Sequence, residues 1–368
     1  MITPKTRRTR WAALTTAALA MLIVSACSSN SSSSSTTPNG GSSPSTSSTS
    51  SSLSGTLNAS GSTFQTNFQQ AAISAFKSVD SGITVNYGAG GSGKGRTDLA
   101  GGVVNFAGSD SPIPTTETAN FKGKKVLYFP VLIGPITMAY NLSGVSSLKL
   151  TPTVIADIFQ GKITSWNNSA IKSLNPGANL PSTSITLAVR SDSSGTTQNF
   201  SLFLQKAAGS AWTLGSSSTI KWPATAHAAQ GNSGVAQAIK TTPGAIGYVD
   251  LSTAKASQLS FASVKNKAGS YVAPSASAAS ASASTATVAP DLTFHAIWGS
   301  APTAYPITYQ SWDLVYAQQP NANDAAMLKA YLGYLLGAGQ QLLPGLSYAP
   351  LPASIDSMAK AQLSQITG

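Results

Sequence analysis

Three short segments of the sequence combine a flexible backbone with hydroxyl, amide or charged groups that suit a small oxyanion. They are Gly61-Ser62-Thr63-Phe64, the glycine loop Gly88–Gly95 with Asp110 shortly after it, and the run Arg190–Thr196. Converging N–H groups, hydroxyl donors and one guanidinium together bind a tetrahedral oxyanion well. A carboxylate is unexpected in such a set. Asp110 is therefore the residue that bears most directly on which anion is bound.

The chemistry of Asp110 favours an anion that carries a proton. Phosphate near neutral pH is protonated and can donate a hydrogen bond to a carboxylate, whereas sulfate cannot. Sites built to bond a ligand hydroxyl reject analogues that lack it by about 10⁴–10⁵-fold, because a buried polar group is left unpaired. The sequence Ser109–Pro112 is also typical of a turn, so Asp110 by itself does not distinguish a ligand-binding role from a structural one. Together with the other segments it indicates phosphate.

The elements that position these segments alternate between strand and helix. Strands are predicted over residues 55–59, 83–87, 103–108, 125–132, 136–141, 185–190 and 245–249, and helices over 65–79, 152–159 and 196–206. The dipeptide Gly134-Pro135 is expected to separate two of the strands. Strand–loop–helix repeats predict an α/β fold with mostly parallel sheets, in which ligands bind at the carboxyl ends of strands. All three polar segments fall at such ends.

The glycine loop nearly matches a nucleotide-binding P-loop, because Gly88, Gly93 and Lys94 have that spacing after a strand. The next position is Gly95, where the motif requires Ser or Thr to hold magnesium. A P-loop is therefore not expected. The remaining alternatives are an anion site made by N–H groups of the loop and the following helix start, or a glycine turn without a ligand.

The first residues indicate where the protein is located. Basic residues between Lys5 and Arg10 precede the apolar run 11–24, which is too short to span a membrane and has the form of a signal peptide. The run ends in Leu22–Cys27 (LIVSAC), as in bacterial lipoproteins, whose cysteine thiol is lipidated. Cys27 is the only cysteine, so disulfides and thiolate sites are excluded. The alternative is an ordinary signal peptide that contains a cysteine.

The domain organisation follows from composition. Residues 1–26 are predicted to be the lipoprotein signal peptide and residues 27–54 a lipidated, Ser-rich tether that cannot bury apolar surface. A second biased stretch, 273–290, is rich in Ala and Ser and is expected to be a surface loop insertion without a functional role. The remaining body of roughly 310 residues exceeds what one core usually serves, so two lobes are expected.

Composition and charge exclude several functions. Four of the 22 basic residues lie in the leader, and without them the formal net charge falls from +11 to +7. With 9% charged residues and no dense Lys/Arg stripe, no nucleic-acid partner is expected. His227 and His295, the two histidines, lie in unlike contexts, so neither a zinc site nor a Ser-His-Asp hydrolase is predicted. No metal and no cofactor are expected.

Several motifs in order resemble the phosphate-binding protein of the bacterial phosphate-specific ABC transporter, a periplasmic-binding-protein-like lipoprotein. They are Gly61–Phe64, the glycine loop with Ser92, Phe106–Asp110, Gly161–Asn167, Leu174–Gly177, Val189–Thr197 and Gly244–Val249. The resemblance covers essentially all of residues 55–368 except the Ala/Ser-rich insertion. It implies a type II two-lobe α/β fold with the ligand in the interlobe cleft. Lobe I would comprise 55–133 and 251–368, and lobe II 134–250.

Carried over position by position, the resemblance also implies the binding residues. Asp192 would orient the guanidinium, while Lys94 and Ser193 depart from the residues usual in the family. The implied phosphate ligands are Thr63, Phe64, Ser92, Asp110, Arg190, Ser194, Gly195 and Thr196.

The function implied by the resemblance is capture of inorganic phosphate for import, not catalysis. The expected partners are phosphate, the permease subunits and ATPase of an ABC importer, and the cell membrane, to which a lipid would anchor the protein on the extracytoplasmic face. The protein is expected to be a monomer. The residues leave open binding of another ligand such as sulfate, molybdate or a carbohydrate, a secreted phosphatase, and a cell-surface adhesin. The sequence shows neither the paired metal cluster nor the activated nucleophile that a phosphatase would use.

Overall fold

The computed structural model describes residues 53–368. The predicted signal peptide (1–26), Cys27 and nearly all of the predicted tether (27–54) lie outside the described residues. Among the helices of residues 53–368, none has both the length and the apolar character required to cross a bilayer.

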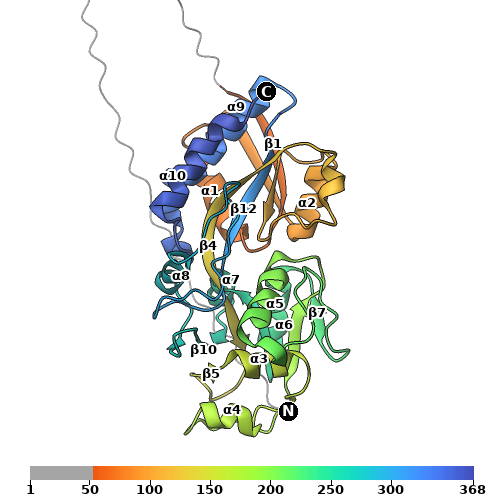
Figure 1. The fold of residues 1–368 in the computed structure, drawn as a ribbon, viewed down its shortest axis with the longest axis vertical. Coiled ribbons are helices and arrows are strands. Elements are labelled where there is room, and N and C mark those ends of the chain that lie inside the picture. The colour runs from red at the N-terminus through yellow and green to blue at the C-terminus, as the bar shows by residue number, and fades with distance from the viewer. Residues whose placement is uncertain (1–52) are drawn as a thin grey trace, which may run out of the picture. The chain divides into compact units, whose positions relative to one another are not determined.

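The chain alternates between strands and helices, as the sequence predicts (Figure 1). The strands are β1 (Gly55–Gly61), β2 (Ile83–Ala89), β3 (Phe106–Ser109), β4 (Val126–Tyr140), β5 (Lys149–Leu150), β6 (Thr186–Arg190), β7 (His227–Ala229), β8 (Ala245–Asp250), β9 (Ser260–Phe261), β10 (Ser263–Lys265), β11 (Tyr271–Val272) and β12 (Thr308–Tyr316). The α-helices are α1 (Thr66–Phe76), α2 (Ser92–Ala100), α3 (Pro152–Phe159), α4 (Ser169–Leu174), α5 (Gly195–Ala207), α6 (Gly231–Thr241), α7 (Leu251–Ala256), α8 (Ala276–Ala283), α9 (Ala322–Leu336) and α10 (Ala353–Gln362).

Strand β4 links the two halves of the sheet. Its first part pairs antiparallel with β12, and its second part, from Ile136 onward, pairs antiparallel with β8. The prediction of two strands separated by Gly134-Pro135 is wrong, because the strand continues through both residues. The fixed φ of proline is compatible with extended backbone. At Gly134 a side chain would lie 2.8 Å from the Phe64 ring, so glycine permits close packing there.

The strand order is β2-β1-β3-β12-β4-β8-β6-β7. Strands β1, β2 and β3 pair in parallel, as do β6, β7 and β8, but β4 and β12 run antiparallel between these two groups. The sheet is therefore mixed rather than mostly parallel. In Figure 1, α1, α2, α9 and α10 lie around the first group of strands, and α3, α5 and α6 around the second.

The lobe limits predicted from the sequence stay a proposal. Strand β9 pairs with Ala139 and Tyr140 of β4, and β10 pairs with β5. Residues that follow β8 thus still contact the second half. This pairing favours a return to the first half later than residue 250, near the start of β12.

The Ala/Ser-rich segment 273–290 is not a surface loop. It contains helix α8, which Ser275 caps by accepting a hydrogen bond from the N–H of Ala278. One face of the helix is buried, and the Ser282 hydroxyl donates to the carbonyl of Ala296 at 2.6 Å. Alanine is the best helix former, and its small side chain lets a helix pack closely against a sheet. Low-complexity composition therefore misled the sequence-based prediction.

A buried carboxylate on β12 makes stability depend on pH. Asp313 is fully buried and accepts from Gln69 Nε2 at 3.1 Å. Burial raises its pKa to about 7, although hydrogen bonds from Gln69 and Gln65 act to lower it. A pKa raised above the unfolded value means that the folded state holds the proton more tightly. Stability from this group is therefore present at low pH and is lost as the pH rises from about 4 to 7.

We expect Asp313→Asn to raise the melting temperature at pH 8, because a neutral amide replaces a buried charge whose ionisation costs on the order of 4 kcal/mol. The gain should shrink toward pH 5, where Asp313 is itself neutral. Thermal melts of both proteins at pH 5 and pH 8 measure this. A variant that is less stable than the wild type at pH 8 would show that the carboxylate is well accommodated when ionised.

Candidate functional site

The three polar segments meet at the carboxyl ends of strands from both halves of the sheet. Strand β1 ends at Gly61, β3 ends just before Asp110, and β6 ends at Arg190. Helices α2 and α5 begin within two of these segments, at Ser92 and Gly195, and these two residues lie against each other. Amide N–H groups in the first turn of a helix have no partner within the helix and can therefore bind an anion.

The first segment joins the two halves. The Thr63 hydroxyl accepts a hydrogen bond from the N–H of Asn232 at 3.2 Å, which joins the first half to the second. The Phe64 ring is buried, with its centroid 4.1 Å from that of Tyr309. The Phe64 N–H donates to the Ser62 hydroxyl at 3.1 Å, and the Phe64 carbonyl accepts from Tyr348. Thr63 and Phe64 therefore lie where the two halves meet, while their contacts to a ligand stay a prediction.

The glycine loop brings α2 against the segment after β6. The Gly93 N–H donates to the carbonyl of Ser193 at 3.0 Å. Gly91 has a φ of +93°, and a Cβ there would lie 2.3 Å from Oδ2 of Asp192. Only glycine satisfies both the backbone and the space at this position. The glycines are thus required for close approach of the two halves.

Asp110 lies where the two halves meet and is only 1% exposed. Its Oδ1 accepts hydrogen bonds from the hydroxyls of Ser62 at 2.5 Å and Ser311 at 2.6 Å. The hydroxyl of Ser92 is 3.4 Å from Oδ2. Burial raises the pKa of Asp110 to about 6, while the two serine hydroxyls and the charge of Arg190 act to lower it.

Arg190 is held on two sides. Its Nε donates to Asp192 Oδ1 at 2.7 Å, its Nη2 donates to Asp192 Oδ2, and its Nη1 donates to Asn232 Oδ1 at 2.7 Å. Burial raises the pKa of Asp192, but the hydrogen bonds and charge of Arg190 outweigh burial and leave that pKa below its ordinary value. A guanidinium has five N–H donors. Nη1 also donates to the Thr196 hydroxyl in a long hydrogen bond of 3.4 Å, so one N–H, on Nη2, has no partner among residues 53–368.

The start of α5 lies directly against Asp110 and Ser92. A Cβ on Gly195 would be 2.4 Å from Ser92 Oγ and 2.6 Å from Asp110 Cβ. The Ser194 hydroxyl caps the helix by accepting from the N–H of Thr197 at 3.1 Å. Ser194, Gly195 and Thr196 are all buried. The structure thus brings Ser92, Asp110, Arg190 and the start of α5 together, as the sequence predicts, with the rest of the predicted set around them.

Three residues that hold this site were not predicted. Ser311 donates to Asp110 from 201 positions along the chain. Asn199 Nδ2 donates to the Asp110 carbonyl at 2.6 Å, and Asn232 contacts both Arg190 and Thr63. The first two have no local sequence signal. Asn232 follows Gly231, which has a φ of +68° just after β7, and a glycine before a helix start at a strand end could have revealed it.

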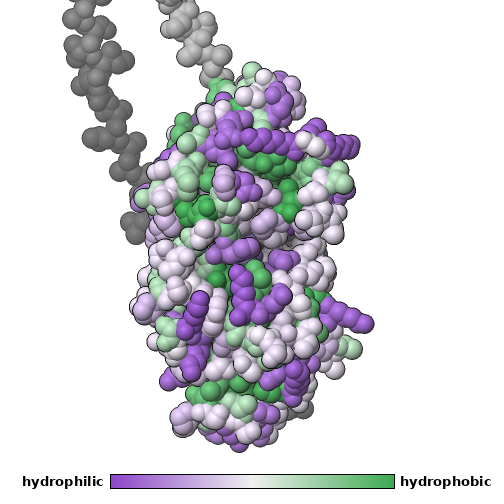
Figure 2. All heavy atoms as spheres, in the orientation of Figure 1, coloured by the Kyte–Doolittle hydropathy of each residue, from purple (hydrophilic) through white to green (hydrophobic). Residues whose placement is uncertain are grey.

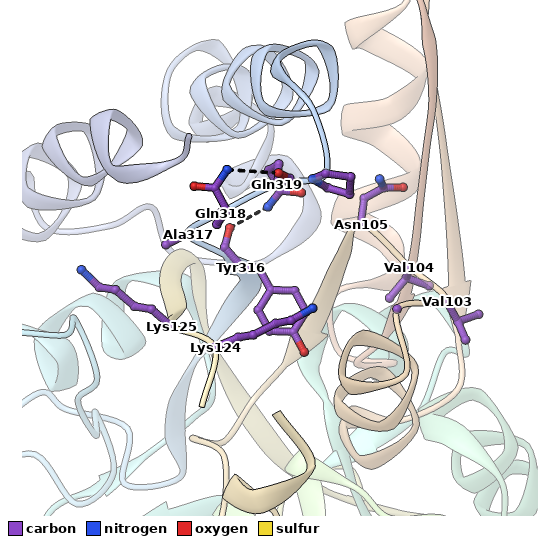
Figure 3. A pocket seen from close by; sticks show the side chains of 11 residues that line it. Val103, Val104, Asn105, Lys124, Lys125, Tyr316, Ala317, Gln318 and Gln319 are labelled. Carbon is purple, nitrogen blue, oxygen red and sulfur yellow. Dashed lines mark hydrogen bonds between the residues drawn. The ribbon is translucent and has the colours of Figure 1, made fainter. Parts of the chain in front are cut away.

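A groove of about 600 Å³ lies near the end of β12 (Figure 3). Its lining includes Val103, Asn105 and Tyr316. Lys124 lies over the Tyr316 ring, with Nζ 5.0 Å from the centroid. None of the predicted binding residues lines this groove. On the face drawn in Figure 2, hydrophobic residues form small separate patches between polar ones.

The groups gathered between the two halves are suited to bind a protonated oxyanion. Arg190 and the N-terminus of α5 offer donors and positive potential, and Asp110 offers an acceptor for a ligand proton. Among residues 53–368, no three His, Cys, Asp or Glu side chains cluster as a metal site requires.

Comparison with known proteins gives consistent matches over most of the chain. A family model described as a PBP superfamily domain matches residues 46–338. The phosphate-binding protein PstS3 of Mycobacterium bovis BCG is 36% identical over 321 residues, which is 84% of this chain and 86% of that protein. The phosphate-binding protein PstS of Xylella fastidiosa is 34% identical over 297 residues, covering 78% of this chain and 79% of the relative.

A solved structure supports the same architecture. A high-affinity periplasmic phosphate-binding protein (PfluDING), solved with bound phosphate, matches with a TM-score of 0.70 at 22% identity. The match covers 84% of this chain and 94% of that one. The α/β fold of periplasmic-binding-protein type expected from the sequence is thereby confirmed.

Proposed function

Because this chain belongs to the PstS family of phosphate-binding proteins, we propose that it captures inorganic phosphate outside the cytoplasm and delivers it to an ABC permease. Family membership confirms the expectation of a binding protein rather than an enzyme. It therefore removes the secreted phosphatase from the alternatives left open by the sequence.

The observation that carries the proposal is the buried Asp110 carboxylate beside the Arg190 guanidinium and the start of α5. A site for a fully ionised anion would contain donors alone. An acceptor at its centre instead matches a ligand that is both negatively charged and protonated, which describes phosphate near neutral pH. We assign to Asp110 the acceptance of the ligand proton.

We propose that the remaining predicted residues act as donors. Arg190 supplies the Nη2 N–H that does not bond Asp192 and the Nη1 N–H that makes only a long hydrogen bond to Thr196, and Asp192 holds the guanidinium in place. The other donors are hydroxyls and backbone N–H groups, which bind an anion without adding mobile charge. They belong to Thr63, Phe64, Ser92, Ser194, Gly195 and Thr196.

Delivery to an importer is tested in the cells that make the protein. Under phosphate limitation, cells that lack this chain should take up phosphate more slowly at micromolar concentrations, while sulfate uptake stays unchanged. Expression of the wild-type chain from a plasmid should restore phosphate uptake. Unchanged phosphate uptake in a strain without other phosphate-binding proteins would contradict the transport role.

We also propose that a lipid on Cys27 anchors the protein to the outer face of the cell membrane. Cys27 is the only cysteine and ends the lipoprotein-type leader. A diacylglyceryl group supplies the two acyl chains that stable anchoring requires. The tether between Cys27 and β1 is long enough to separate the binding domain from the membrane.

Cys27→Ser is expected to leave the protein either unprocessed or soluble, because the serine hydroxyl cannot accept the lipid. Fractionation of cells that express each form measures this, with Ser28→Ala as a control that leaves the thiol in place. A Cys27→Ser protein that loses its leader and still sediments with membranes would contradict lipidation.

A further inference from the structure

The two oxygens of the Asp110 carboxylate have different environments. Oδ1 receives two short hydrogen bonds, from the hydroxyls of Ser62 and Ser311 at 2.5 and 2.6 Å. Oδ2 has one long contact, to the Ser92 hydroxyl at 3.4 Å. The Ser92 oxygen also accepts from the Asp110 N–H at 3.1 Å. Oδ1 therefore has its acceptor capacity largely filled, and Oδ2 is the oxygen that can still accept a strong hydrogen bond.

The direction of the hydrogen bond from Ser311 is fixed by Gln65. Gln65 Nε2 donates to the carbonyl of Trp312 at 2.9 Å, and a carbonyl can only accept, so this contact orients the Gln65 amide. The same Nε2 donates to Ser311 Oγ at 2.7 Å. Because Ser311 Oγ already accepts this N–H, its own hydrogen is directed to an acceptor, and Asp110 Oδ1 at 2.6 Å is the nearest one.

Gln65 is in turn held by a chain of buried donors. Gln69 Nε2 donates to Gln65 Oε1 at 2.9 Å, and the Tyr331 hydroxyl donates to Gln69 Oε1 at 2.7 Å. All of these side chains are buried. Each hydrogen bond thus runs in one direction, from Tyr331 through the two glutamines and Ser311 to Asp110. Such chains polarise their members and strengthen the final hydrogen bond.

We propose that Ser311, which Gln65 orients, is a specificity-determining residue of this site. Its hydroxyl occupies one oxygen of Asp110, so only the other oxygen can accept the ligand proton. The inference rests on the proposed function, because it concerns how the same site distinguishes protonated from unprotonated oxyanions. The Ser62 hydroxyl donates to the same oxygen of Asp110.

The charges around Asp110 define what Ser311 contributes. Arg190 favours its ionised form and Asp250 opposes it. The nearby phenols of Tyr87, Tyr309 and Tyr348 stay neutral, because burial raises the pKa of each. Ser311 and Ser62 are the hydroxyls that lower the pKa of Asp110 against the effect of burial. Without the Ser311 hydroxyl, Asp110 would take up a proton at a higher pH.

A protonated Asp110 is a donor and no longer rejects sulfate. Removing the Ser311 hydroxyl should therefore move sulfate binding to higher pH. The experiment is competition of sulfate against labelled phosphate on the mature chain between pH 5 and pH 8, for the wild type and Ser311→Ala. We expect the sulfate-binding profile of the variant to lie about one pH unit higher, which lowers the phosphate-to-sulfate affinity ratio about 5-fold at pH 7 and about 10-fold at pH 8.

Two further variants separate this role from a purely structural one. Ser311→Thr keeps the hydroxyl and should retain the wild-type profile. Ser201→Ala removes another buried hydroxyl, which donates to the Thr197 carbonyl in α5, and should also leave the profile unchanged. If Ser311→Ala does not fold, as judged by circular dichroism, Ser62→Ala decides the question, and the same upward shift is expected for it.

The proposal is overturned if a folded Ser311→Ala variant, or Ser62→Ala in its place, binds phosphate and shows the same pH profile of sulfate competition as the wild type. It is equally overturned if both anions weaken by the same factor at every pH. These outcomes differ from failure of the proposed function, in which the wild-type chain itself would not bind phosphate or would not prefer it to sulfate.

Discussion

Replacement of Arg190 with lysine should weaken phosphate binding by about 2 kcal/mol or more, which is roughly a 30-fold increase in Kd. Three of the five N–H groups of the guanidinium bond Asp192 and Asn232, a fourth makes a long hydrogen bond to Thr196, and the fifth is open to a ligand. A lysine ammonium has three donors in a compact group and cannot bond Asp192, Asn232 and phosphate at once. Charge is kept, so the loss reports geometry. Isothermal titration of the two proteins with phosphate measures it.

The controls for this prediction use neighbouring groups. Arg96 is also buried and forms a bidentate ion pair with Glu117, with N–O distances of 2.6 and 2.9 Å, but it is not one of the predicted binding residues. Arg96→Lys should change stability more than phosphate affinity. Asp192→Ala should weaken binding less than Arg190→Lys, because Asn232 still holds the guanidinium. Equal affinity in wild type and Arg190→Lys would remove Arg190 from the site.

The second large effect concerns discrimination. Asp110→Asn should reduce the preference for phosphate over sulfate by on the order of 100-fold or more, because the amide can donate to an unprotonated oxygen that the carboxylate repels. Phosphate affinity should change much less, since repulsion of the phosphate dianion is relieved while an acceptor is weakened. Competition between the two anions at pH 8 measures both quantities.

The protonation of Asp110 determines how the affinity for sulfate changes with pH. With a pKa of about 6, Asp110 in the free protein is protonated in about one molecule in a hundred at pH 8 and in most molecules at pH 5. Sulfate affinity of the wild type should therefore rise as the pH falls through 6, and Asp110→Asn should lose this dependence. Asp98→Asn, in α2 but bonded to Lys94 and Ser60, is the matched control. The same sulfate profile in Asp110→Asn and wild type would reject the role of Asp110.

Local sequence predicted the parts of the site that are contiguous in the chain. Each predicted segment follows a strand, and parallel strands bring their carboxyl ends to one edge, so Ser92, Asp110 and Arg190 could be placed together from sequence. Ser311 could not, because its position depends on the register of β12 against β3, where Trp312 pairs with Ser109. Asn199 lies in α5 of the second half, so its contact with Asp110 depends on how the two halves pack.

The errors in the fold also have physical causes. Gly134-Pro135 is typical of a strand break, but β12 and β8 hold β4 extended on both sides of these residues. The Ala/Ser composition of α8 is typical of a loop insertion, yet Ala278 and Ala279 are buried against the rest of the protein. In both places long-range contacts override the local signal, which sequence patterns cannot represent.

The most direct test of phosphate recognition is isothermal titration of the mature chain with phosphate, arsenate and sulfate at pH 8. Arsenate carries protons as phosphate does, so it serves as a positive control for the role of the ligand proton. Phosphate and arsenate should each bind one site per chain, and sulfate should give no measurable heat at the same concentrations. Sulfate binding as tight as phosphate binding, or an absence of phosphate binding, would contradict recognition of a protonated oxyanion by Asp110.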